Sequence, residues 1–183
     1  MTRRMLVAGV GNIFLGDDGF GAEVIKRLAV EQLPDWVRVA DYGTSGMHLA
    51  YDLAEGYETT ILIDAASRGE EPGTVTVIEV DPAEHQAPAD EPLQGTQLFD
   101  AHGMQPDVVF GVLDMLGAKA GRILVVGCEP ASIEYRMSLS EPVAAAVDEA
   151  ARVVMDMVTA AAQDPGAGSD GAAAQPVTLS DER

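Results

Sequence analysis

Five short apolar runs along the chain predict the strands of one sheet. The first run, at 5–10, is apolar throughout and ends at a glycine, a pattern typical of a central parallel strand buried on both faces. Further strands are expected at 37–40, 59–63, 75–80 and 123–126, where valine, isoleucine and threonine are frequent. Each run is followed by a glycine or an aspartate, so polar groups are predicted where the strands end.

Helical periodicity fills most of the intervals between these strands. An apolar stripe begins at Phe20 and recurs at every third or fourth position, which predicts an amphipathic helix. Other helices are expected at 47–53, at 106–116 after an opening proline, and from 140–142 onward. This alternation predicts an α/β fold, with a single three-layer domain, an open and mostly parallel sheet, and helices on both faces. In such sheets, ligands gather at the carboxyl ends of the strands.

The domain is expected to span residues 1–162. Residues 163–183 are rich in glycine, alanine, serine and acids without apolar periodicity, so we expect a disordered acidic tail. Inside the domain, the stretch 81–105 contains several prolines and many acids but no lysine or arginine. A loop of this length within a compact domain is typically functional or mobile.

Composition narrows the classes of function. The chain has 30 acidic and 11 basic residues, and its net charge of −19 argues against nonspecific binding to nucleic acid or to an anionic membrane. No apolar run is long enough to cross a bilayer, and one cysteine, Cys128, cannot form an internal disulfide. We therefore expect a cytoplasmic protein, and also a monomer.

The glycine-rich segment after the first strand, GVGNIFLGDDGFG, resembles a nucleotide-binding turn only in part. The dinucleotide fingerprint requires a third glycine where this chain has Phe14. Asp17 and Asp18 would also repel a phosphate at the start of the following helix. A dinucleotide-dependent oxidoreductase therefore remains an alternative that these residues disfavour, and no organic cofactor is expected.

Three polar side chains are expected to converge at the strand ends. One of Asp17 and Asp18 is explained by capping of the next helix, which leaves the other free. Asp64 follows the third strand, and His102 lies near the end of the long loop. Two carboxylates and an imidazole with open positions would suit a borderline divalent metal such as nickel or zinc. Asp64 as an ordinary loop acid and His102 as a solvated histidine remain the simpler alternatives.

Covalent catalysis finds little support in the sequence. Cys128 follows an apolar strand, and a small buried hydrophobic residue is its expected role. A pair formed by Cys128 and His102 stays open, although no local nucleophile signature surrounds the cysteine. The chain has no Gly-x-Ser-x-Gly elbow either. A hydrolase built on this chain would have to use metal, carboxylate or substrate-supplied chemistry.

The ordered set of motifs resembles the nickel–iron hydrogenase maturation endopeptidases over nearly the whole domain. The motifs that carry this resemblance are Gly9-Val10-Gly11-Asn12, Asp17-Asp18-Gly19, Asp41-Tyr42-Gly43-Thr44, Ile63-Asp64-Ala65, His102-Gly103 and Gly127-Cys128-Glu129-Pro130. The resemblance implies an aspartyl-type endopeptidase that removes the C-terminal peptide of a nickel–iron hydrogenase large-subunit precursor after nickel insertion. The precursor is then the expected partner, and it presents the nickel.

The resemblance also assigns roles to residues. The family's metal-contacting trio falls on Asp18, Asp64 and His102, which are the expected catalytic and metal-contacting residues, with Asp17 as the neighbouring alternative to Asp18. Asp41, Gly43 and Thr44 are expected to line the substrate cleft. A nickel-sensing chaperone that docks the precursor without cutting it would use the same trio, so it remains an alternative.

Overall fold

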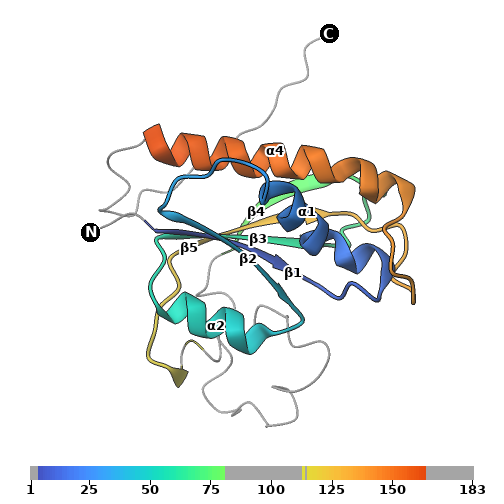
Figure 1. Cartoon of the computed structure of the whole chain (residues 1–183). Coiled ribbons are helices and arrows are strands. Elements are labelled where there is room, and N and C mark those ends of the chain that lie inside the picture. Colours follow the sequence, from blue (N-terminus) through green and yellow to red (C-terminus); the bar gives the residue numbers. More distant parts are fainter. Residues whose placement is uncertain (1–3, 81–112, 114, 164–183) are drawn as a thin grey trace.

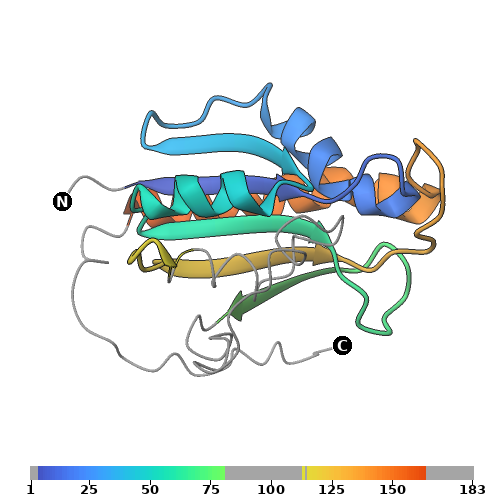
Figure 2. The same cartoon turned by 90° about the horizontal axis from the view of Figure 1, so that it is seen from below.

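The computed structural model describes residues 4–80, 113 and 115–163. Five strands form one sheet in the order β2-β1-β3-β5-β4. The bounds of these strands are β1 Met5–Val10, β2 Val37–Gly43, β3 Thr59–Ala65, β4 Val75–Val80 and β5 Arg122–Cys128. β2, β1, β3 and β5 run parallel, and β4 pairs antiparallel with β5 at one edge. Figure 2 shows the strands side by side in this order.

Helices cover both faces of the sheet, which confirms the predicted three-layer α/β domain (Figure 1). α1 (Phe20–Leu28) and α4 (Glu141–Gln163) pack together on one face, and α2 (Gly46–Ala54) lies on the other. A short 3-10 helix, η1 (Gly16–Gly19), joins the end of β1 to α1.

The alternation of side chains along β1 divides the interior into two apolar cores. Met5 and Val7 face α1 and α4, whereas Leu6, Ala8 and Val10 face α2. All six residues of β1 are buried, as expected for a central strand covered on both faces. The edge strands β2 and β4 are only partly buried.

Three strands extend further than the apolar runs predicted. β2 continues to Gly43, β3 to Ala65 and β5 to Cys128, because backbone pairing persists past the last apolar residue. Asp64, for example, still pairs with Gly127 across the sheet. The two aspartates expected just after strands, Asp41 and Asp64, are thereby held on the regular backbone of β2 and β3 rather than on loose turns.

Several sequence predictions fall outside the described residues. They concern His102, the long loop at 81–105, most of the helix expected at 106–116 and the tail. The last described helix, α4, ends at Gln163, next to the predicted domain boundary. Among the helices that the structure describes, none is sufficiently long and apolar to span a membrane.

Candidate active site

The connection between β1 and α1 brings Asp18 to the end of β3. Gly11, with φ +118°, starts this turn, and a Cβ atom on it would collide with the carbonyl oxygen of Asp18. The same Cβ would lie 3.4 Å from Oδ1 of Asp64. Only glycine therefore allows this close approach of the two acidic segments.

Asp18 lies in η1 with a partly buried side chain. Its Oδ2 accepts a hydrogen bond from the backbone N–H of Asn12 at 2.7 Å, which fixes the carboxylate against the turn. Its negative charge is close enough to Asp64 to disfavour ionisation of that residue. Asp18 and Asp64 thus form one electrostatically coupled pair.

Asp64 has the most perturbed carboxyl group at this edge of the sheet. Its Oδ1 is buried and has no hydrogen-bond partner within the described residues. Burial, with the neighbouring charge of Asp18 as the next cause, raises the pKa of Asp64 to about 7, although the Ala65 amide lowers it. A buried carboxylate oxygen without a donor is unfavourable unless it binds a cation or a proton. The pair is therefore suited to hold either one.

Asp17 is fully buried and serves a different purpose from its neighbour. Its Oδ2 accepts hydrogen bonds from the amides of Ala131 (2.8 Å) and Ser132 (3.0 Å) and from the Ser140 hydroxyl (2.8 Å). Its Oδ1 accepts the Ser140 amide at 2.6 Å. Burial alone would raise the pKa of Asp17, but these hydrogen bonds outweigh it and lower the pKa. Both oxygens are thus engaged in holding the 131–140 loop.

The helix-capping prediction for these two acids is wrong. The N-cap residue of α1 is Gly19, and no side chain caps that helix. The reason is that η1 intervenes between the acids and α1, so that Asp17 turns toward the 131–140 loop and Asp18 turns back to Asn12.

The Asp41–Thr44 turn borders the same site from β2. Gly43 adopts φ +54°, its N–H donates to Oδ1 of Asp41 at 3.0 Å, and its carbonyl accepts the N–H of Gly11 at 2.9 Å. The turn is therefore tied directly to the glycine that packs against Asp18. Asp41 and Thr44 are exposed.

The third expected member of the site, His102, lies outside the described residues. Within the part of the chain that the structure describes, no three His, Cys, Asp or Glu side chains are grouped as a metal site would require. His48, on α2, is exposed. The structure therefore brings together Asp18 and Asp64 and leaves the full trio as a prediction.

Cys128 is buried in the core between the sheet, α1 and α4, as predicted. Burial, followed by the charges of Asp17 and Glu129, raises the pKa of the Cys128 thiol to about 11. A thiol in this environment is protonated at neutral pH, and it acts as a small apolar residue rather than as a nucleophile.

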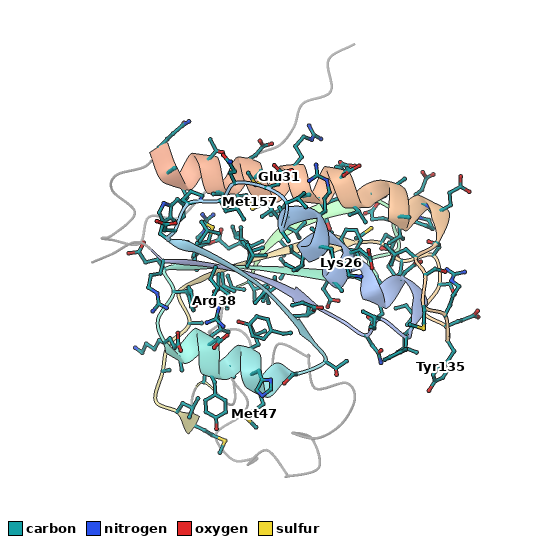
Figure 3. All side chains as sticks on the ribbon, viewed as in Figure 1. Lys26, Glu31, Arg38, Met47, Tyr135 and Met157 are labelled. Atoms are coloured by element: carbon teal, nitrogen blue, oxygen red, sulfur yellow. The ribbon has the colours of Figure 1, made fainter. Side chains whose placement is uncertain are left out.

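Sequence reasoning missed a polar network that supports the Asp41–Thr44 turn from α2. The hydroxyl of Tyr42 donates to the carboxylate of Asp52, and Arg38 forms an ion pair with the same carboxylate at 2.8 Å. Figure 3 shows Arg38 between the sheet and α2. Burial, together with the bond to Asp52, raises the pKa of Tyr42 above its ordinary value. No local sequence motif predicts this contact, because it arises from the packing of α2 on β2.

Comparison with known proteins identifies the family of this chain. The model of the hydrogenase maturation protease family matches residues 22–157. The hydrogenase 2 maturation protease of Escherichia coli is 30% identical over 164 residues, covering 89% of this chain and 93% of the relative. The hydrogenase expression/formation protein HupD of Rhizobium leguminosarum is 31% identical over 180 residues, covering 95% of this chain and 83% of the relative.

A solved structure shows the same fold. The hydrogenase maturating endopeptidase HybD of Escherichia coli superposes with a TM-score of 0.68 at 30% identity, covering 86% of this chain and 93% of that chain. By sequence and by fold, the chain belongs to the hydrogenase maturation protease family.

Proposed function

We propose that this protease removes the C-terminal peptide of a nickel–iron hydrogenase large-subunit precursor after nickel has been inserted. In this proposal, Asp18, Asp64 and His102 contact the nickel that the precursor presents. Asp41, Gly43 and Thr44 line the cleft that receives the peptide. Family membership supports the class of substrate, and the pair of carboxylates supports the mode of recognition.

The observation that carries this proposal is the unpartnered Oδ1 of Asp64 beside Asp18. Two carboxylates in this position repel each other, and burial of one of them adds a desolvation penalty. A divalent cation brought by the substrate would relieve both effects at once. Only a precursor that carries the metal would then bind productively, which explains how cleavage could wait for nickel insertion.

The reaction itself is the hydrolysis of one peptide bond. A water molecule near the nickel attacks the carbonyl carbon, the C–N bond breaks, and a proton passes to the leaving amine. We propose that a carboxylate of the Asp18–Asp64 pair accepts the proton that the attacking water loses. The Gly43–Gly11 contact holds the cleft turn next to this carboxylate.

The test is to mix the purified protein with nickel-loaded and nickel-free precursor and to measure the mass of the precursor. We expect a shortened chain only in the nickel-loaded sample. His102→Ala and Asp64→Asn should fold normally and abolish processing, whereas Asp148→Asn, an exposed acid on α4, should process normally. A stable complex without any shortened chain would instead favour the nickel-sensing chaperone.

A further inference from the structure

Exposed apolar side chains gather on two segments beside the candidate active site. Of the ten large apolar residues that are exposed within the described residues, five lie on the 13–14 turn and the 133–137 loop. They are Ile13, Phe14, Ile133, Tyr135 and Met137. Tyr135 is 93% exposed, and Figure 3 shows it at the tip of its loop, pointing away from the sheet.

The two segments are joined into one rigid platform. The Gly16 amide donates to the Arg136 carbonyl at 2.7 Å, and the Arg136 amide donates to the Phe14 carbonyl at 3.0 Å. Gly16 also lies so close to the loop that a Cβ atom on it would be 3.0 Å from the Ser132 carbonyl oxygen. The four hydrogen bonds of Asp17 fasten the ends of the loop. The backbone beneath the exposed side chains is therefore held in one arrangement.

A hollow of about 410 Å³ lies between this platform and the first turns of α4. Ile13, Met137 and Leu139 line it from the platform. Ala144 and Val147 line it from α4.

One charged side chain, Glu23, lies at the hollow, and it is paired with Lys26 at 2.6 Å. Apart from Ser138, the other side chains that line the hollow among the described residues are apolar, so it can accept an apolar side chain.

The platform is continuous with the site. Gly16 and Gly19, which also line the hollow, flank the Asp17–Asp18 pair in η1. A protein substrate whose peptide bond reaches Asp18 and Asp64 must therefore cover the adjoining surface. A backbone that is already fixed presents its apolar side chains without the entropic cost of ordering a loop on binding.

We propose that this platform docks an apolar segment of the large-subunit precursor next to the bond that is cut. The inference rests on the proposed function and deepens it, because it places part of the substrate affinity outside the carboxylate site. Exposed apolar residues clustered in this way mark interaction surfaces more often than isolated ones do.

The experiment changes the platform without touching the carboxylates: Met137→Asp introduces a charge into the hollow, and Tyr135→Ser removes an exposed aromatic ring. Met137→Asp and Tyr135→Ser are compared with Val30→Asp, since Val30 is 77% exposed, Met137 is 75% exposed, and Val30 follows the far end of α1. For nickel-loaded precursor, we expect both platform variants to raise KM, Met137→Asp by about tenfold, with kcat within about twofold of wild type. Val30→Asp should leave both constants unchanged.

The possible outcomes separate the two proposals. An unchanged KM in both platform variants, with wild-type cleavage intact, overturns the docking surface alone. If the wild type binds precursor without cutting it, the endopeptidase proposal fails, and docking stands only if Met137→Asp weakens that binding. If the wild type neither binds nor cuts, both fail. Sedimentation velocity then measures the oligomeric state of wild type and Met137→Asp. If the wild type is a dimer, Met137→Asp is a monomer and KM is unaltered, the platform is a self-association surface and not a docking site for the precursor.

Discussion

Asp17 lies in η1 and Asp64 near the end of β3, but the surroundings of their carboxylates are opposite. Asp17 receives four hydrogen bonds, which lower its pKa despite full burial. Asp64 has a buried oxygen without a partner in the described residues, and burial with the Asp18 charge raises its pKa to about 7. The fold satisfies one carboxylate completely and leaves the other in need of a cation or a proton. The first role is structural, and the second is suited to a reaction.

The largest effect should come from removing the charge of Asp64. Asp64→Asn keeps the size of the side chain but removes the carboxylate that faces Asp18. We expect the rate of precursor processing to fall by about 10³-fold or more, while the fold is retained. Mass spectrometry of the precursor over time measures the rate. Processing within tenfold of wild type would contradict the assigned role.

Asp17 should show the reverse behaviour, with a large effect on stability. Asp17→Ala leaves the amides of Ala131, Ser132 and Ser140 without the buried carboxylate that accepts their hydrogen bonds. We expect the free energy of unfolding to fall by about 3 kcal/mol, as judged from the loss of several hydrogen bonds to a charged group. Urea denaturation followed by circular dichroism measures this change. A loss below about 0.5 kcal/mol would mean that the 131–140 loop does not depend on Asp17.

This contrast shows where sequence reasoning succeeds and where it stops. The apolar runs and helical stripes predicted the α/β sheet, because burial periodicity depends on local spacing alone. They also placed Asp64 at a strand end. The division of labour between Asp17 and Asp18 was not predictable, because adjacent identical residues carry the same local signal. Asp17 accepts hydrogen bonds from Ser140, which is 123 residues later in the chain, and Asp18 accepts one from Asn12, which is six residues earlier. The tertiary fold selects these partners.

The raised pKa of Asp64 should make stability depend on pH. Folding raises this pKa from the ordinary 3.8 to about 7, so the folded state holds the proton more tightly. Stability therefore falls as pH rises from about 4 to about 7, and the full penalty is present above that range. Asp64→Asn removes the penalty and should be more stable than wild type by about 4 kcal/mol at pH 8 in metal-free buffer, but not at pH 4.

Urea denaturation of both proteins across this pH range provides the measurement. Asp18→Asn provides a second test, because loss of the neighbouring charge should lower the pKa of Asp64. The fall in stability should then end at a lower pH than in wild type. If the unfolding free energies of wild type and Asp64→Asn change in parallel with pH, Asp64 has an ordinary pKa. The proposed difference between Asp17 and Asp64 would then be wrong.

The smallest effect is expected at Tyr42, whose hydroxyl links the Asp41–Thr44 turn to Asp52 on α2. Tyr42→Phe keeps the ring packed and removes one hydrogen bond, while Arg38 continues to neutralise Asp52. We expect a loss of about 1 kcal/mol in unfolding free energy. Because the turn borders the site, KM for the precursor should rise a few-fold at unchanged kcat. An unaltered KM with the same stability loss would show that Tyr42 supports the fold but does not position the cleft.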